Sequence, residues 1–225
     1  MQKPLKITLF GAGAIGTTLA AWLTAAGHDV SLLARGDNAQ ELKRKSIRLV
    51  NDNNVLLSDT RVRVIETLGA AEEIDLLIIT VKNFHLDNCC YDIVNAIGRN
   101  TLILGLQNGV ENQTTLPKHF ARVLYGIINY NAWRSISTSE GSNNTLDWSV
   151  NLNGPIVLGS LNSELKPAAE NLTELFSNFI HCQYSGNFYD HAHAKLVNNI
   201  ANSVTTLIGN SHREAAALKP LQALF

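Results

Sequence analysis

The segment Gly11–Gly16, with the sequence GAGAIG, constrains the fold of this chain more than any other. It directly follows a strand-like apolar run, Leu5–Phe10, and opens a helical pattern over Ala14–Ala26 that Gly27 ends. A second strand is predicted over Asp29–Ala34. A strand, a glycine-rich turn, a helix and a second strand within about 30 residues form the first unit of a doubly wound parallel sheet.

The three glycines of this turn have separate predicted roles. Gly11 allows the tight turn, Gly13 lets the backbone approach a pyrophosphate, and Gly16 permits close packing of the helix. The helix N-terminus adds amide donors and the positive end of its dipole. A turn whose glycines serve packing alone is the alternative. We predict a dinucleotide-binding site formed by Gly11, Ala12, Gly13, Ala14, Ile15 and Gly16.

The pattern that follows keeps the alternating order of an α/β protein. Ile74–Val81 is nearly all apolar, as expected for a central strand covered on both faces. Other strands are predicted at 47–50, 55–57, 61–65, 101–106, 123–128, 149–152 and 156–158, and helices at 37–45, 86–97 and 164–180. The predicted fold class is therefore α/β, with a Rossmann-type doubly wound parallel sheet.

The character of the chain changes near residue 185. Helical spacing runs from Asn187 to Ile208 without a strand of similar quality, and Ser185–Asn187 is the predicted linker. We therefore predict a Rossmann domain over 1–185 and the start of an all-helical second domain over 186–225. About 40 residues cannot build a core of their own, so this segment must pack on the first domain or on a partner subunit.

Composition excludes several classes of partner. Lys plus Arg is 18 and Asp plus Glu is 19, a balance that provides no general footprint for nucleic acid or an anionic membrane. No apolar run reaches the roughly 18 residues of a membrane span, and the first strand leaves no room for a signal peptide, so we expect a cytoplasmic protein. Cys89, Cys90 and Cys182 form neither a disulfide framework nor a zinc cluster, and we predict no metal site.

The end of the second strand bears on the choice of dinucleotide. NAD-preferring domains place an acid there, about 20 residues beyond the glycines, to accept the ribose hydroxyls. Arg35 stands at that place, and a guanidinium pairs bidentately with a 2′-phosphate. Asp37 is the acid if the strand runs on, or else the N-cap of the next helix. The pattern favours NADP(H) over NAD(H).

Two later strands end in polar residues. TVK at 80–82 and LQNG at 106–109 end neighbouring predicted strands, and ligands of such sheets bind outside the carboxyl ends of the strands. Lys82 and Asn108 are therefore expected to face the cofactor. A solvated lysine and a turn asparagine before Gly109 are the alternatives.

A lysine on the last predicted helix is a candidate acid. Lys195 and Asn199 are four positions apart and share a helix face, and Asn202 falls on much the same side. A lysine held over a cleft could protonate a carbonyl oxygen as a hydride reaches the carbon. A surface lysine on an amphipathic helix is the alternative.

Taken in order, these segments resemble those of the ketopantoate reductase family (2-dehydropantoate 2-reductases). The resemblance rests on GAGAIG, Arg35, TVK, LQNG and the KLVNN run at 195–199, and it extends from residue 5 to about residue 208. It implies a Rossmann domain that binds NADP(H) and a helical domain that closes over a cleft. It also implies NADPH-dependent reduction of 2-dehydropantoate (ketopantoate) to pantoate, in pantothenate biosynthesis.

The resemblance also implies a role for each matching residue. Arg35 would hold the 2′-phosphate, and Lys82 would lie along the cofactor. Asn108 would lie between nicotinamide and substrate, and the segment around Ala132 would approach the nicotinamide. Hydride would be transferred to the C2 carbonyl of the substrate.

Lys195 would be the general acid and Asn199 would hydrogen-bond the substrate. The helix departs from the family pattern at His193, where an aromatic residue is usual, and beyond Asn199, where a second asparagine is usual. Either Asn202 or Ser203 replaces that asparagine, or its contact with the substrate is lost. The chain also ends before the later family helices, which carry a serine and a glutamate of the active site. A non-catalytic NADP(H)-binding paralogue and a reductase of another 2-oxo acid therefore stay open, as does a homodimer.

Overall fold

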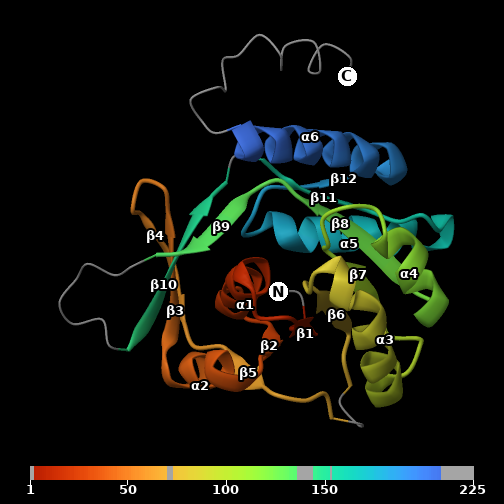
Figure 1. Cartoon of the computed structure of the whole chain (residues 1–225). Coiled ribbons are helices and arrows are strands. Elements are labelled where there is room, and N and C mark those ends of the chain that lie inside the picture. The colour runs from red at the N-terminus through yellow and green to blue at the C-terminus, as the bar shows by residue number, and fades with distance from the viewer. Residues whose placement is uncertain (1–2, 70–72, 136–143, 153, 209–225) are drawn as a thin grey trace.

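The structure, a computed structural model, describes residues 3–69, 73–135, 144–152 and 154–208. These residues form a large central sheet with helices on both faces and a smaller second sheet at one side (Figure 1). The α/β class predicted from the sequence is confirmed. No helix in the described part of the chain is both long and apolar enough to cross a membrane.

The main sheet has the strand order β12-β11-β8-β7-β6-β1-β2-β5. All neighbours are parallel except β8 and β11, so the predicted parallel sheet is confirmed with one antiparallel pair near its edge. The strands are β1 (Lys6–Phe10), β2 (Asp29–Leu33), β5 (Arg63–Ile65), β6 (Leu76–Ile79), β7 (Ile103–Gly105), β8 (Val123–Ile128), β11 (Ile156–Gly159) and β12 (Cys182–Tyr184).

The register of the central strands aligns their carboxyl ends. Phe10 pairs with both Leu33 and Ile79, and Ile79 pairs with Gly105. The residues that follow β1, β2, β6 and β7 therefore meet at one edge of the sheet, which is where a ligand of a doubly wound fold binds.

The second sheet was not predicted. Its order is β4-β3-β10-β9, and the central pair, β3 with β10, is parallel. Its strands are β3 (Ser46–Asn51), β4 (Leu56–Thr60), β9 (Asn131–Arg134) and β10 (Thr145–Asn151). Local patterns predicted strands near three of these positions, but the pairing of β3 with β10 joins segments far apart in sequence, and periodicity carries no signal for such a partner.

One of the observed helices was not predicted. The helices are α1 (Ala14–Ala25), α2 (Gly36–Arg44), α3 (Asn83–Ile97), α4 (Asn112–His119), the 3₁₀ turn η1 (Ser163–Leu165), α5 (Lys166–Ser177) and α6 (Phe188–Ile208). Helix α4 was missed, because it spans only eight residues and carries Pro117 where a helical pattern would be expected to stop. Strands β9 and β12 were missed as well.

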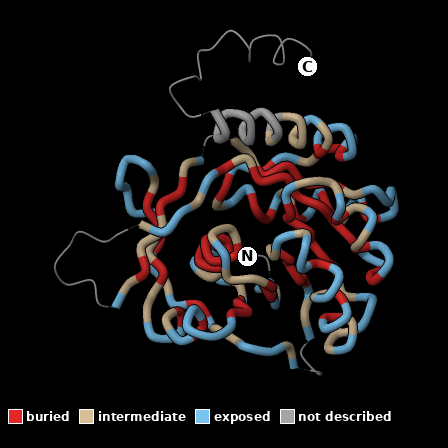
Figure 2. The backbone as a smooth tube through the Cα atoms, viewed as in Figure 1, coloured by how far each residue is buried: buried red, intermediate tan, exposed pale blue. Residues whose placement is uncertain are grey.

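Two apolar clusters form the core, one on each face of the main sheet. Ile7 and Leu9 of β1 point to the face covered by α1 and α5, whereas Phe10 belongs to the cluster under α3 and α4. This alternation is the period of a strand covered on both sides. Figure 2 shows the buried residues along the sheet and on the inner faces of the helices.

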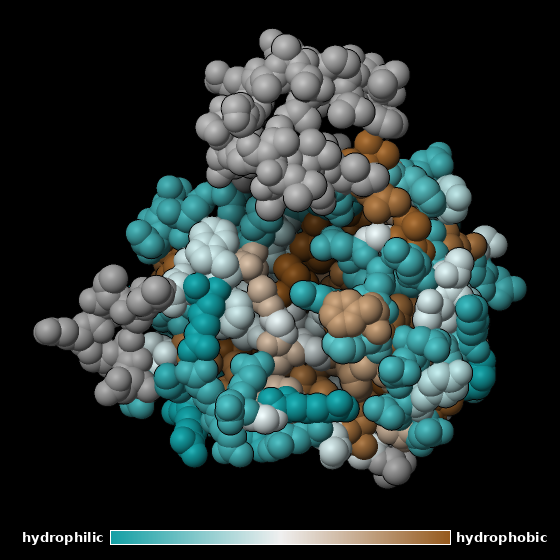
Figure 3. All heavy atoms as spheres, viewed as in Figure 1, coloured by the Kyte–Doolittle hydropathy of each residue, from teal (hydrophilic) through white to brown (hydrophobic). Residues whose placement is uncertain are grey.

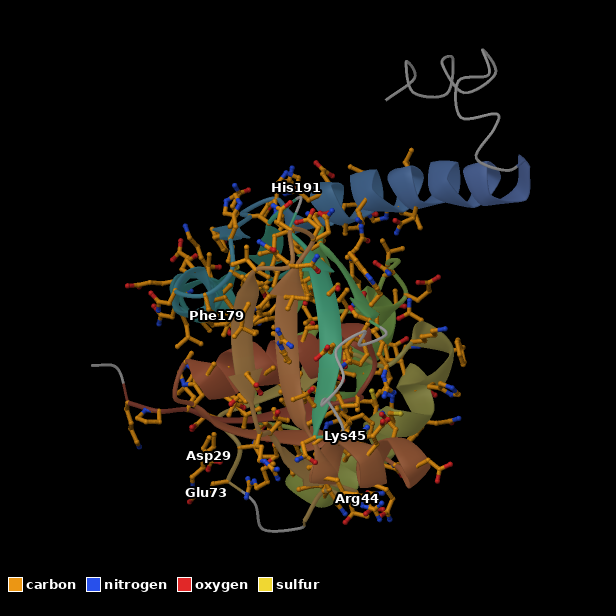
Figure 4. All side chains as sticks on the ribbon, turned by 90° about the vertical axis from the view of Figure 1, so that its left-hand side faces the viewer. Asp29, Arg44, Lys45, Glu73, Phe179 and His191 are labelled. Atoms are coloured by element: carbon orange, nitrogen blue, oxygen red, sulfur yellow. The ribbon has the colours of Figure 1, made fainter. Side chains whose placement is uncertain are left out.

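Helix α6 packs on the main sheet through its first turns. Phe188 stacks on Tyr125 of β8 with a centroid distance of 5.7 Å, and Ala192 is also buried. Asp29 marks the amino end of β2. In Figure 4, α6 projects away from the side of the molecule on which Asp29 lies. The later turns of α6 therefore extend past the carboxyl edge. The division into domains at residue 185 stays a prediction, and the segment 209–225 lies outside the described residues.

Candidate functional site

The glycine-rich turn lies at the carboxyl edge of the sheet, between β1 and α1. Gly11 has a φ of +122°, a conformation that glycine adopts without strain. The hydroxyl of Thr80, which directly follows β6, donates a hydrogen bond of 2.8 Å to the Gly11 carbonyl. A Cβ on Gly11 would lie 2.9 Å from that same hydroxyl oxygen. The turn is thus fastened to the neighbouring strand.

Gly13 and Gly16 differ sharply in their surroundings. A Cβ on Gly16 would lie 1.9 Å from the carbonyl oxygen of Gly11, so the first turn of α1 packs directly on the loop. A Cβ on Gly13 would meet nothing within 4 Å. Gly13 is the N-cap residue of α1, and no side chain caps this helix end. The helix N-terminus therefore opens into free space that an anionic ligand could fill.

A cleft of ≈ 350 Å³ runs beside this turn. The turn residues Gly11 and Ala12 form part of one side, and α3 contributes the facing side. The Asn38 side chain of α2 also lines the cleft and donates a hydrogen bond of 3.1 Å to the carbonyl of Ala12. Figure 3 shows that this face of the molecule is hollowed at its centre, with apolar residues inside the hollow and hydrophilic ones around it.

Arg35 lines the cleft, as expected for a residue that faces the dinucleotide. Its side chain is 66% exposed, and its Nη2 lies 3.8 Å from Oδ2 of Asp92 on α3. Both interpretations of Asp37 were wrong. Strand β2 ends at Leu33, so Asp37 does not end the strand, and the N-cap position of α2 is taken by Arg35, which leaves Asp37 in the first helical turn.

Lys82 is the N-cap residue of α3 and is exposed. Its Nζ lies 6.0 Å from the centroid of the Phe84 ring, and Lys82 does not line the cleft that contains Arg35. Ala132 lies in β9, where it is half-buried and packs against the core cluster that contains α1. Neither residue is among those that line the cleft beside the glycine turn.

A second pocket brings together two residues that the sequence proposed for catalysis. Asn108, in the loop after β7, and Lys195, on α6, both line it, together with Phe188 and Ala192. Its volume is ≈ 10 Å³, about the space of one water molecule. The pocket in this state accommodates a single oxygen-sized group and is too small for a whole 2-oxo acid.

Lys195 is half-buried in this pocket rather than on a solvated helix surface. Phe188, Ala192 and Lys195 recur at helical spacing, so they share the face of α6 that packs on the sheet. Burial lowers the pKa of the Lys195 ammonium from its ordinary value, because the charged form loses hydration. No carboxylate among the described residues forms an ion pair with it.

The loop that carries Asn108 is held by amide side chains. Gln107 donates to the Ile79 carbonyl at 2.8 Å and accepts from the Asn112 amide at 3.1 Å. Asn83, at the start of α3, donates to the carbonyl oxygen of Asn108 at 2.7 Å. These hydrogen bonds hold the Asn108 loop against β6, through Ile79, and against the start of α3, through Asn83.

Gln113 is a candidate that sequence reasoning missed. It lines the Lys195 pocket, and its buried Nε2 has no hydrogen-bond partner among the described residues. A buried unsatisfied amide is costly, so such a group is a candidate ligand contact. The only signal in the sequence was the repetition of adjacent amides, Gln107-Asn108 and Asn112-Gln113, around a short helix start.

The remaining predicted residues lie further along α6. Asn199 is half-buried one turn beyond Lys195 but does not line the pocket. Asn202 and Ser203 belong to α6, and their side chains lie outside the described residues. The described residues contain no group of three or more His, Cys, Asp or Glu that could hold a metal ion. Burial raises the pKa values of the Cys90 and Cys182 thiols to about 12, which argues against a nucleophilic role.

Comparison with known proteins connects this geometry to one family. The sequence profile described as "Ketopantoate reductase PanE/ApbA" matches residues 7–161, which include β1, the glycine turn, Arg35 and Asn108. The chain belongs to this family. The family resemblance seen in the sequence is thereby confirmed.

Two curated relatives align with this chain over different lengths. The 2-dehydropantoate 2-reductase of Lactococcus lactis subsp. lactis is 25% identical over 219 residues, which cover 96% of this chain and 68% of the relative. The 2-dehydropantoate 2-reductase of Mesorhizobium japonicum is 36% identical over 108 residues, which cover 47% of this chain and 32% of the relative. The chain thus spans from about a third to about two thirds of the length of these relatives.

Solved structures of other proteins share the fold. A 2-dehydropantoate 2-reductase from Geobacter metallireducens superposes with a TM-score of 0.73 at 24% identity, covering 91% of this chain and 66% of that one. D-mandelate dehydrogenase, in a structure with NADH and anilino(oxo)acetate, has a TM-score of 0.73 at 23% identity, covering 91% of this chain and 64% of that one.

Proposed function

We infer that this protein is an oxidoreductase that uses NADPH to reduce 2-dehydropantoate (ketopantoate) to pantoate, a step in pantothenate biosynthesis. The observation that carries this proposal is the shared pocket of Asn108 and Lys195, at the same sheet edge as the Gly11–Gly16 turn. Such a pocket brings a proton donor next to the place where a nicotinamide is expected in this fold.

The glycine turn and Arg35 are the proposed cofactor-binding residues. The open α1 N-terminus at Gly13 suits a pyrophosphate, and the guanidinium of Arg35, which lines the cleft beside the turn, suits a 2′-phosphate. Roles for Lys82 and Ala132 along the cofactor are supported by the family resemblance alone. When bound, NADPH supplies the hydride.

Lys195 is the proposed general acid. Its ammonium would donate a proton to the carbonyl oxygen of the 2-oxo acid as that oxygen becomes an alkoxide. Burial lowers the pKa of Lys195, which makes proton donation easier than from an exposed lysine. Asn108 and Asn199 would hydrogen-bond the substrate, and Asn202 or Ser203 would add a contact from the next turns of α6.

The size of the pocket adds one requirement. A pocket of ≈ 10 Å³ holds one oxygen-sized group, so binding of a whole 2-oxo acid would be accompanied by an opening between α6 and the Asn108 loop. This opening agrees with a helical segment that closes over a bound substrate.

A second candidate is the reduction of a different 2-oxo acid. This option is supported by the structural similarity to D-mandelate dehydrogenase, which was solved with NADH. That protein shares the fold, although its name gives a different substrate. Residues of the helical segment are expected to select the substrate, and His193 there departs from the family pattern.

Oxidation of NADPH by the purified protein, followed by the loss of its absorbance, tests the proposal. We expect turnover with 2-dehydropantoate above that with pyruvate, 2-oxoisovalerate and benzoylformate. Turnover with another acid alone would support the second candidate. Binding of NADPH without turnover of any acid would contradict both and favour a non-catalytic binding protein.

A further inference from the structure

The cleft beside the glycine turn carries opposite charges on its two sides. Arg35 contributes a guanidinium from the β2–α2 connection. Helix α3 presents His85, Asn88, Cys89 and Asp92 to the same cleft, and their spacing of three, four and seven positions is that of one helix face. Asp92 is the only acidic side chain among the described residues that line this cleft.

The two charges interact directly. Nη2 of Arg35 lies 3.8 Å from Oδ2 of Asp92, and each side chain is 66% exposed. The same two charges act on the pKa of the Cys89 thiol. Burial raises the pKa of its thiol, while Arg35 lowers that pKa and Asp92 raises it. The guanidinium that faces the cleft is therefore already paired with a carboxylate that lines the same cleft.

A 2′-phosphate and a ribose hydroxyl respond differently to such a pair. The phosphate carries about −1.5 to −2 charges near neutral pH, so it is attracted by the guanidinium and repelled by the carboxylate. The contact between Arg35 and Asp92 is longer than a hydrogen bond, so the phosphate and the carboxylate compete for the guanidinium through charge and not through a shared donor. A neutral 2′-hydroxyl, as in NADH, experiences neither effect at comparable strength.

We propose that Asp92 is a specificity-determining residue that competes with the 2′-phosphate for Arg35 and thereby limits the preference for NADPH over NADH. This inference rests on the proposed function insofar as the cleft binds a nicotinamide dinucleotide. Asp92 acts through Arg35, so its effect is on the ratio of the two affinities and not on the binding of the common part of the cofactor.

Dissociation constants of NADPH and NADH test this, measured by cofactor fluorescence for the wild type, D92N, R35A and the double variant. In D92N we expect NADPH to bind about threefold to tenfold more tightly, and NADH to stay within about twofold, since exposed ion pairs contribute modestly. In the R35A background the gain from D92N should shrink, because the competition is gone. E174Q is the control, since Glu174 is an exposed acid on α5 and does not line the cleft. It should change neither affinity.

Two outcomes would overturn the inference about Asp92 without affecting the proposed function. One is an NADPH to NADH ratio that D92N leaves unchanged in a protein that binds both nucleotides. The other is weaker NADH binding by D92N with unchanged NADPH binding, which would make Asp92 an acceptor for the ribose hydroxyl. A wild-type protein that binds neither nucleotide would overturn the proposed function and this inference together. Thermal unfolding midpoints of all variants verify that each is folded.

Discussion

The cleft beside the Gly11–Gly16 turn and the Lys195 pocket lie at the same edge of the main sheet, but they are built in different ways. The cleft, of ≈ 350 Å³, is formed by residues from the first 92 positions, and Gly11 and Ala12 of the glycine turn are among them. The pocket, of ≈ 10 Å³, joins side chains from the Asn108 loop and from α6, which are far apart in the chain.

This difference indicates which changes each region tolerates. In the cleft, the shape of the backbone matters, so a single added side chain at the turn is expected to block binding. In the pocket, function depends on the chemistry of individual side chains and on the packing of α6. Changes in the two regions should therefore separate cofactor binding from catalysis.

The largest expected effect is on catalysis. Lys195→Met should lower kcat by about 10²–10⁴-fold, because the proton donor is lost while the side-chain volume is kept. The dissociation constant of NADPH should stay within about twofold, since Lys195 does not line the cleft. Steady-state kinetics and a fluorescence titration measure both values. A kcat that is unchanged, or NADPH binding that is lost with it, would remove the distinction between the two regions.

The next effect concerns the turn. Gly13→Val should weaken NADPH binding by more than about 100-fold and leave the protein folded, because the new side chain enters space that is open in the structure. Gly16→Ala is the informative contrast. Its Cβ would lie 1.9 Å from the Gly11 carbonyl oxygen, and overpacking of this kind costs roughly 1–3 kcal/mol of unfolding free energy.

Thermal unfolding and NADPH titration of both glycine variants decide between a ligand role and a packing role. If Gly13→Val binds NADPH normally, Gly13 does not line the pyrophosphate site. If both variants lower the unfolding midpoint equally, both glycines serve packing and the turn has no separate ligand role.

A smaller effect is expected for Arg35. Arg35→Ala should weaken NADPH binding by about tenfold and change NADH binding little, since the guanidinium has a charged partner in NADPH alone. Parallel titrations with the two nucleotides measure the ratio. A ratio of the two affinities that Arg35→Ala leaves unchanged would show that Arg35 does not recognise a 2′-phosphate.

The smallest effect is a shift in the pH dependence of kcat. Lys195 donates a proton, so its charged form is the active one, and kcat should be constant below its pKa and fall as the pH rises through it. Because burial lowers that pKa, the fall should begin at a lower pH than an ordinary lysine would give. Lys118→Met, at an exposed position of α4, is the control and should leave the profile unchanged. A profile without a break below the ordinary lysine range would contradict the role of Lys195.

The geometry of the glycine turn was predictable because its signals are local. The strand, turn and helix of residues 5–26 follow one another in sequence, and the separate surroundings of Gly11 and Gly16 in the structure match the roles that their spacing indicated. Asp37 was misread because the prediction ran β2 on to Ala34, whereas the strand ends at Leu33 and α2 begins at Gly36.

The pocket side was only partly predictable. The helix of Lys195 was recognised from its period, but its burial depends on Phe188 packing against Tyr125, a contact between distant segments. Gln113 was missed because α4 is short, and the second sheet was missed because β3 and β10 pair across almost one hundred residues of chain. Long-range pairing leaves no periodic trace in the sequence.

The most direct test of the combined site follows the transferred atom. The protein is incubated with 2-dehydropantoate and NADPH that carries deuterium at both C4 positions of the nicotinamide, and the product is analysed by mass spectrometry. If the cleft holds the cofactor beside the Lys195 pocket, the wild type should form pantoate with deuterium at C2, and Lys195→Met should form almost none in the same time. Pantoate whose C2 hydrogen comes from solvent, or no pantoate at saturating bound NADPH, would contradict hydride transfer across this edge of the sheet.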